Sequence, residues 1–341
     1  MQVACTFVTQ NGFTNGAKGG KQSVSVAANT TASPVSGVSP SYWIRVTVSE
    51  QLPLTFLAVL GQQWVTVSSQ STSGVWPSSG GGCIYTLDPT DTDISMNGTT
   101  SLTTGCGVYD NSNSNSAISI VGNGPGITAS QVNVVGNVST HSPSQISPAP
   151  KTGAPSVTDP FAGMPAPTPA VPCINYTGQS VLSGGTYCNT ISLNNGNLTL
   201  NPGIYILEQG LDIGGNATLT NNTTGGDGSG GVMLYSNGGS IDFHGNPTAT
   251  LNAPTTGTYK GVLMWQDKSD NSAVTLKGAS SLQLNGALYF PTAALTYNGG
   301  TNTTNTTIVT YTLSLVGGSN INSAASTAYT STGLSGAHLI Q

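Results

Sequence analysis

Short runs of alternating apolar and polar residues fill most of the chain, and many of these runs share one unit. The unit apolar-x-apolar-x-Gly-Asn occurs at residues 118–123, 132–137, 211–216 and 241–246, with weaker copies from Ile94, Ile191, Val274 and Leu313. Two apolar residues at i and i+2 lie on the same side of a strand. Gly and Asn tolerate the positive φ that a sharp corner requires. The pattern therefore predicts short strands that end in tight corners.

Repetition of such a unit predicts a solenoid in which parallel strands stack about 4.8 Å apart. Successive copies begin 14, 20 or 30 residues apart, which fits coils of about 20–25 residues with inserted loops. Asparagines at the corners are expected to form side-chain amide ladders. We expect a mainly β chain folded as a right-handed parallel β-helix. An antiparallel sandwich with many Asn-Gly hairpins is the alternative.

Residues 1–73 follow a different pattern, which predicts a small α+β module. The segments 22–28, 42–50 and 65–70 alternate apolar with polar residues, as half-buried strands do. The apolar run 52–60 has Pro53 near its start and is followed by Gly61. Pro at the first helical position and Gly after the last are typical of a short helix.

Two shifts in composition divide the remaining chain. Glycines punctuate residues 74–82, and nine of the nineteen prolines lie in residues 143–172. Such a proline-rich stretch is extended and semi-rigid. We expect a first solenoid block at 74–142, a second at 173–341, and between them a segment that either links the blocks or runs along the outside of one.

The amounts of charge and glycine narrow the class of protein. The 341 residues include 45 Gly, only 6% are charged, and seven Lys+Arg against twelve Asp+Glu give a formal charge of -5. So few scattered basic residues exclude a nucleic-acid surface or a polybasic membrane patch. The abundance of Ser, Thr, Asn and Gly indicates an extracellular protein. Neither an export signal nor an apolar run of about 20 residues is present, so we expect the natural N-terminus to lie upstream.

The five cysteines also indicate an extracellular protein. Cys83 with Cys106 and Cys173 with Cys188 form two local pairs, without the C-x-x-C spacing of zinc or redox sites. Disulfides are therefore predicted, and buried free thiols are the alternative. Cys5 is left over.

Candidate chemistry is sparse. Asp267 and Asp270, with Trp265 as a sugar-stacking aromatic, form the best local carboxylate pair for glycoside chemistry. The only arginine in the chain is Arg45, so the solenoid has no arginine to stabilise a developing negative charge, and a solvated loop is favoured.

Two further sets of residues are of types that bind metal ions. Asp88, Asp91 and Asp93 are weak candidates for calcium, because alternating Asp with small residues is also typical of a polar turn. The three histidines are far apart, without Cys or Glu at ligand spacing, and His244 is expected at an exposed corner. We expect no cofactor.

Several segments resemble the large TadE/TadG-like proteins of tight-adherence (Flp) pilus systems. They are residues 83–89, 104–109, 200–207 and 286–291 together with the Gly-Asn corners, while residues 11–16 and 42–69 resemble the family's pseudopilin-like region. Members of that family begin with a membrane-anchoring helix, and this chain starts near where that helix would end. The resemblance supplies no catalytic residues.

The resemblance implies a non-enzymatic structural or adhesion protein, exported through the periplasm and displayed at the cell surface. Its expected partners are pilus or envelope proteins or surface glycans, with self-association possible and membrane attachment only through the missing helix. The alternative is a secreted polysaccharide-binding or polysaccharide-degrading β-helix protein with its site near residues 265–270. Binding of an ice or chitin lattice ranks lowest, because strict Thr-x-Thr ladders are lacking.

Overall fold

The computed structural model describes residues 6, 8–29, 34–35, 42–54, 61, 63–75, 82–277, 282–299, 302–304, 307–323 and 338–339. These residues form two compact units. One unit lies within Met1–Ser79 and Thr332–Gln341, and the other lies within Gly80–Ser331. The second unit is thus inserted into the sequence of the first.

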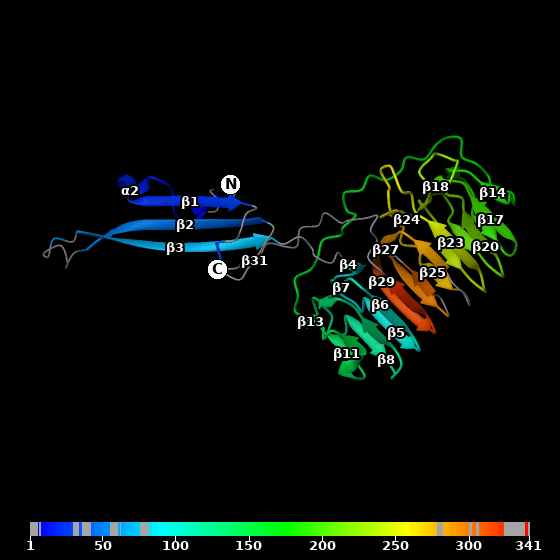
Figure 1. Ribbon diagram of the computed structural model, residues 1–341, viewed down its shortest axis with the longest axis horizontal. Coiled ribbons are helices and arrows are strands. Elements are labelled where there is room, and N and C mark those ends of the chain that lie inside the picture. Colours follow the sequence, from blue (N-terminus) through cyan, green and yellow to red (C-terminus); the bar gives the residue numbers. More distant parts are fainter. Residues whose placement is uncertain are drawn as a thin grey trace. The chain divides into compact units, whose positions relative to one another are not determined.

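The first unit is an antiparallel sheet in the order β1–β2–β3–β31 (Figure 1). Its elements are the short helix α2 (Ala17–Gly20) and the strands β1 (Gln22–Asn29), β2 (Tyr42–Pro53), β3 (Trp64–Val75) and β31 (His338–Leu339). The three predicted strands are confirmed, and each is longer than predicted. The last strand, β31, pairs with β3 and not with the second unit, in which the sequence had placed it.

The helix predicted at residues 52–60 is wrong at its start. Leu52 and Pro53 belong to β2 because they pair with Val65 and Trp64 of β3, which extends the sheet past the expected strand end. Residues 55–60 lie outside the described residues.

The second unit consists mainly of short strands. They are β4 (Gly82–Thr86), β5 (Ile94–Gly98), β6 (Ser101–Thr104), β7 (Gly107–Asp110), β8 (Ile118–Val121), β9 (Gly126–Thr128), β10 (Gln131–Val134), β11 (Val138–Thr140), β12 (Ile146–Ser147), β13 (Lys151–Thr152), β14 (Val181–Leu182), β15 (Gly185–Tyr187), β16 (Ile191–Leu193), β17 (Asn197–Leu200), β18 (Gly203–Leu207), β19 (Leu211–Ile213), β20 (Thr218–Asn221), β21 (Val232–Ser236), β22 (Ile241–Phe243), β23 (Thr248–Asn252), β24 (Val262–Gln266), β25 (Val274–Lys277), β26 (Leu282–Asn285), β27 (Ala287–Asn298), β28 (Asn302–Thr304), β29 (Ile308–Gly317) and β30 (Asn320–Ser323). One 3₁₀ turn, η2 (Pro143–Gln145), lies between β11 and β12.

All pairings between the described strands of this unit are parallel, in one 17-stranded and two five-stranded sheets. We call one turn of the chain, such as β18–β20, a rung. Equivalent apolar residues of successive rungs pair in register, for example Ile191 with Leu211 and Leu211 with Ile241, and all three are buried in one core. This arrangement is compatible with the predicted parallel β-helix, and the antiparallel sandwich is excluded.

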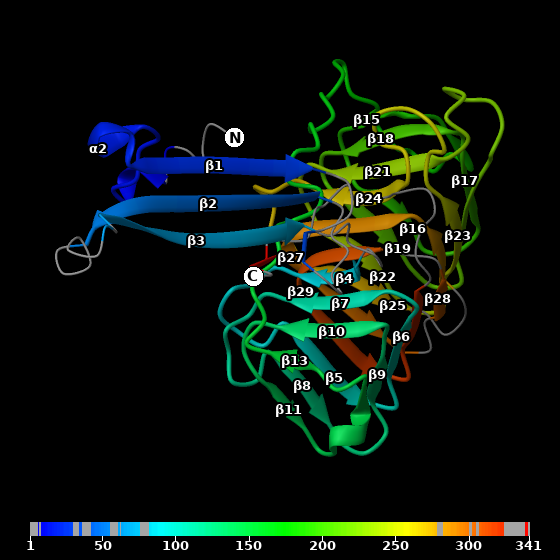
Figure 2. The same ribbon diagram turned by 60° about the vertical axis from the view of Figure 1, so that its left-hand side comes forward.

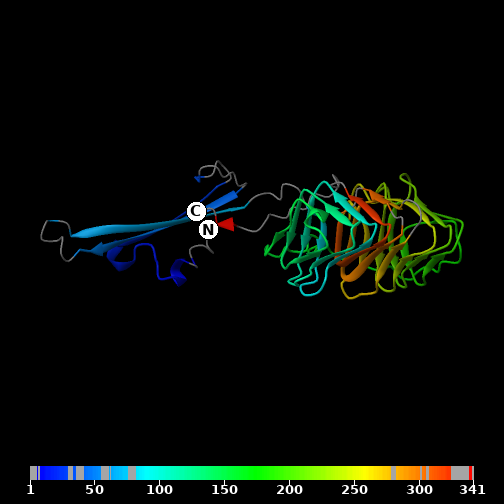
Figure 3. The same ribbon diagram turned by 90° about the horizontal axis from the view of Figure 1, so that it is seen from below.

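The rungs do not stack in chain order. Near the end of the unit, β29 pairs in parallel with β4 and β5, and β30 pairs with β6. Residues 173–323 therefore form one part of the stack and residues 82–152 continue it, as the orange-red rungs beside the cyan rungs show (Figure 3). The two predicted blocks form one continuous stack, and we call the junction between β29–β30 and β4–β6 the seam.

A proline-rich segment connects the two ends of the stack. The predicted linker began at residue 143, but η2, β12 and β13 still belong to rungs, so we define the strap as residues 153–172. The strap runs along the outside of the stack, which was one of its two predicted courses. Hydrogen bonds along its length include those that join Val157 to Asn111 (two bonds of 2.8 Å), Ala162 to Lys268 (3.1 Å), Pro165 to Tyr259 (3.1 Å) and Ala170 to Thr186 (2.8 Å).

The strap covers a second apolar cluster on the outer face of the largest sheet. Phe161, 1% exposed, packs against Tyr289 with ring centroids 5.1 Å apart. The Tyr289 hydroxyl donates a hydrogen bond of 2.6 Å to Asp159 Oδ2 of the strap. The same cluster contains Trp265 and Tyr235, which make an edge-to-face contact. The outer face beneath the strap is therefore a sealed interior and not a free surface.

The corner of the repeat at Gly245 has the predicted positive φ, +80°, and a Cβ there would lie 2.9 Å from Gly215 O of the preceding rung. An amide ladder is present at another corner, at the ends of β20, β23 and β26 and outside the Gly-Asn units. Asn285 Nδ2 donates to Asn252 Oδ1 (2.9 Å), and Asn252 Nδ2 donates to Asn221 Oδ1 (3.3 Å). These bonds tie neighbouring rungs together outside the apolar core.

Candidate functional site

A line of short polar side chains runs along the outside of the stack. In most of the contributing strands one outward residue lies between inward apolar ones, as Ser119 does between Ile118 and Ile120. The strands that carry these residues stack side by side (Figure 1, Figure 2). Their parallel register aligns the outward residues from rung to rung. We call this line the polar row; its members, in stack order, are Ser192, Asp212, Asp242, Thr275, Thr296, Ser314, Ser95, Ser119 and Ser139.

The polar row continues across the seam. Ser95 Oγ donates a hydrogen bond of 3.1 Å to Ser314 Oγ, which joins residues from the two ends of the unit's sequence. At about 4.8 Å between strands the row extends for roughly 38 Å. Its side chains are exposed or half-buried, so the row offers solvent a regular series of hydroxyl groups, with charge confined to two neighbouring aspartates.

Those two aspartates meet a histidine that the sequence analysis had not connected with them. His244 Nδ1 lies 3.2 Å from Asp212 Oδ1 and 3.7 Å from Asp242 Oδ2. His244 lies at a corner as expected, but its ring turns toward the row. Aligning two copies of the repeat would have predicted this contact. Asp212 and Asp242 occupy the same position in their copies, and His244 follows Asp242 by two residues, on the same side of the strand.

No family model matches the chain, and neither a curated protein nor a solved structure matches it significantly. Among the described residues, no helix is long and apolar enough to cross a membrane.

The structure covers the aromatic candidate for sugar chemistry and engages both carboxylates in a turn. Trp265 is 2% exposed and packs against Tyr235 and Tyr289 under the strap, so its ring offers no open face for a sugar. Asp267 and Asp270 each accept a hydrogen bond from a backbone N–H two residues ahead, at 2.8 and 2.9 Å. The two carboxylates thus stabilise a turn.

Hydrogen bonding also fixes the charge state of Asp267. Burial raises its pKa, but hydrogen bonds from Ser269 and from the Tyr235 hydroxyl outweigh that effect and hold the pKa below its usual value. A carboxyl of this kind is ionised at neutral pH and is poorly suited to act as a general acid.

The three calcium candidates lie at a corner beside the seam, and only two of them are buried. Asp88 and Asp93 are buried at 3% and 0% exposure, whereas Asp91 is exposed. A buried carboxyl that the sequence analysis did not single out, Asp110, lies at the same corner. Among the described residues, these aspartates do not bring three ligand atoms within 4.8 Å of one another, which Asp212, Asp242 and His244 do.

Burial changes the protonation of this corner. Desolvation, followed by repulsion from Asp110 and Asp88, raises the pKa of Asp93 to about 9, while Thr86 lowers it slightly. Desolvation likewise raises the pKa of Asp110 to about 7, against a lowering hydrogen bond from the Ser112 backbone. The corner therefore holds protons that ordinary aspartates would release.

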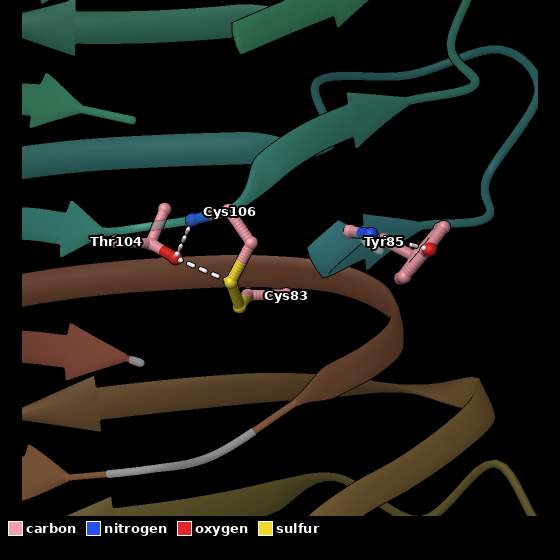
Figure 4. The surroundings of a disulfide bond; sticks show 5 residues. Cys83, Tyr85, Thr104 and Cys106 are labelled. Carbon is pink, nitrogen blue, oxygen red and sulfur yellow. Dashed lines mark hydrogen bonds between the residues drawn. A yellow bond between two sulfur atoms is a disulfide. The ribbon is translucent and has the colours of Figure 1, made fainter. Parts of the chain in front are cut away.

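Both predicted cysteine pairs are disulfides. Cys83–Cys106 joins two neighbouring rungs beside the seam, with Cα atoms 5.5 Å apart. The Cys106 backbone N–H donates a hydrogen bond of 3.2 Å to Thr104 Oγ1 (Figure 4). Cys173–Cys188, with Cα atoms 5.4 Å apart, fixes the end of the strap to the stack. Cys5 lies outside the described residues.

Proposed function

We propose that this protein is a non-enzymatic structural or adhesion protein of a pilus or cell envelope. In this proposal the stacked unit is a right-handed parallel β-helix, the first unit is a pseudopilin-like module, and the chain is exported through the periplasm to the cell surface. The two disulfides support an oxidising compartment. The observation that carries the proposal is the polar row.

The polar row suits binding to an extended surface for two physical reasons. Ser and Thr are short side chains on hydrogen-bonded strands, so little conformational entropy is lost when they engage a partner. Their spacing is set by the backbone and repeats from rung to rung. Such a surface matches a repeating polar partner: a surface glycan, an envelope protein or a second copy of this chain.

Retention of the intact protein on chitin beads, cellulose beads and an immobilised second copy tests the proposal. We expect retention on at least one of them that persists at high salt, because hydrogen bonds between uncharged groups are not screened. The double substitution Ser119→Arg with Thr296→Arg should reduce retention at least tenfold. The matched control is Thr250→Arg, an exposed outward residue of β23 in another sheet. Retention on none of the three matrices, or equal retention of both variants, overturns the proposal.

The polysaccharide-degrading alternative makes a different prediction. It requires Asp267 and Asp270 for release of reducing ends or unsaturated products from pectin or alginate. The covered Trp265 ring weighs against it. In the structural proposal, the double substitution of both aspartates by Ala leaves retention unchanged and no product is formed from either polymer.

A further inference from the structure

The two aspartates of the polar row lie close enough to repel each other. Asp212 of β19 and Asp242 of β22 are direct register partners, so two like charges lie on adjacent strands about 4.8 Å apart. Like charges directly opposite each other destabilise a sheet. The chain contains only twelve acidic residues, and the other positions of the row carry neutral hydroxyls. A positive charge between the two carboxylates removes this cost.

The His244 ring is directed into the space between the two carboxylates by a glycine. Gly214 occupies the position of the preceding rung that corresponds to His244, and a Cβ on Gly214 would lie 2.3 Å from His244 Nε2. The Nε2 edge of the imidazole therefore occupies the space that a side chain at 214 would fill, and Nδ1 lies near Asp212 and Asp242. Any larger residue at 214 would displace the ring.

The contact between these groups is not a completed hydrogen bond. His244 Nδ1 is shielded from solvent and has no hydrogen-bond partner, although Asp212 Oδ1 is only 3.2 Å away. The other Asp212 oxygen, Oδ2, accepts a 2.9 Å hydrogen bond from Ser192 Oγ, which orients the carboxylate and leaves Oδ1 available. A short nitrogen–oxygen distance without hydrogen-bond geometry is what two ligands of one cation show.

We propose that Asp212 Oδ1, Asp242 Oδ2 and His244 Nδ1 bind a divalent transition-metal ion of the Zn²⁺ class. The three atoms lie within 4.8 Å of one another. Tetrahedral ligands at about 2.0–2.1 Å from zinc are roughly 3.3 Å apart, close to the distances from Nδ1 to the two oxygens. Ser192 supplies the outer hydrogen bond that typically orients a ligating carboxylate.

The donor set distinguishes among metals. One imidazole nitrogen with two carboxylate oxygens suits zinc, cobalt or nickel, whereas calcium takes six to eight oxygen ligands. Three protein ligands leave a fourth position open. The side chains of Asp212, Asp242 and His244 are 40%, 43% and 45% exposed, so that position faces solvent and accepts water or a donor group from a bound partner. Asp212 and Asp242 belong to the polar row, but the metal site does not depend on the proposed adhesive function.

Calorimetric titration of the intact, untagged protein with ZnCl₂ after chelator treatment tests the site, with Co²⁺ absorption as a second readout. We expect one Zn²⁺ per chain, and Co²⁺ bands typical of a low-coordinate site with one nitrogen ligand. Asp242→Asn and His244→Gln should each weaken binding at least tenfold. Gly214→Ala keeps all three ligands but displaces the ring, so it should weaken binding comparably.

The controls separate this site from nonspecific binding and from a simple ion pair. Asp267→Asn removes a carboxylate elsewhere and should leave the affinity unchanged, and circular dichroism verifies the fold of each variant. Absence of stoichiometric Zn²⁺ binding by the wild type shows that Asp212, Asp242 and His244 form only an ion pair, and overturns the proposal. Binding that survives His244→Gln also overturns it. Loss of surface retention with intact zinc binding would contradict the adhesive function alone.

Discussion

At the scale of single residues, the most unusual feature of the molecule is its buried carboxyl groups. A chain in which 6% of residues are charged places Asp88, Asp93 and Asp110 in its interior. Neither carboxylate oxygen of Asp93 has a hydrogen-bond partner of good geometry. Burial of an ionised group under these conditions is expensive, and protonation is the way to avoid it.

Stability is therefore expected to fall as pH rises. A carboxyl whose pKa is raised on folding favours the folded state below its unfolded pKa, near 4, and this contribution is lost as pH rises through the folded values of about 7 for Asp110 and about 9 for Asp93. Asp93→Asn keeps the shape and removes the titration. Melting temperatures measured from pH 5 to pH 9 should decline less in this variant than in the wild type, with the variant more stable at pH 9.

The exposed neighbour supplies the control for this measurement. Asp91→Asn alters a side chain that already lies in water, so it should keep the wild-type slope. An identical slope in Asp93→Asn and the wild type would show that Asp93 is ionised in the folded protein.

At the scale of elements, the repeat predicted the strands and their inward faces but not their neighbours. The residue pairs Ile118 with Ile120 and Leu211 with Ile213 are buried in the core, as their spacing requires. The rungs share one pattern, however, so the periodicity does not predict which rungs are neighbours in the stack. Trp265 shows why the burial of a single side chain could not be predicted. The sequence indicates the strand that carries it, but the strap that covers it lies about 100 residues earlier in the chain.

The strap is expected to contribute substantially to stability through one side chain. Phe161→Ala leaves a cavity beside Tyr289, and loss of a buried phenylalanine typically costs about 3–5 kcal/mol. Val171→Ala provides the control within the strap, because Val171 is 91% exposed and its loss should cost almost nothing. Urea unfolding measures both, and equal free energies of unfolding would mean that the strap is not docked in solution.

The disulfide at the end of the strap makes a second contribution. The Cys173→Ser, Cys188→Ser variant opens a loop with a sequence separation of 15 and should lose roughly 3 kcal/mol in the chain-entropy model. The same change at Cys83 and Cys106, separation 23, should lose slightly more. Unfolding under non-reducing conditions measures both losses, and an unchanged midpoint in either variant contradicts the expectation for that bond.

At the scale of the whole molecule, the order of the rungs in the stack is a circular permutation of their order in the sequence. Ser323 pairs with Thr104, and Gly82 pairs with Gly107 of the adjacent rung. Only Gly105 and Cys106 separate Thr104 from Gly107, so a linker of about two residues should also join Ser323 to Gly82. The sequence of the first unit thus interrupts the second unit between two positions that belong to consecutive rungs.

A circular permutant tests this description of the second unit. It begins within the strap, at residue 163, runs to Ser323, continues through a two-residue linker to Gly82, and ends at residue 162. We expect a soluble protein with the β-rich circular dichroism spectrum and cooperative unfolding of the parent unit. The control is the unpermuted second unit, residues 82–323, measured under the same conditions. Failure of the permutant to fold while this control folds would show that the seam is misplaced.

The seam also determines the order in which the protein can be completed during synthesis. Strands β4–β6 are made early, yet their partners β29 and β30 are made more than 200 residues later. Until then, one side of the early rungs keeps unpaired backbone groups, and open strand edges of this kind promote aggregation. A chain that terminates before residue 300 lacks β29 and β30, so its early rungs keep that open edge permanently and are expected to aggregate.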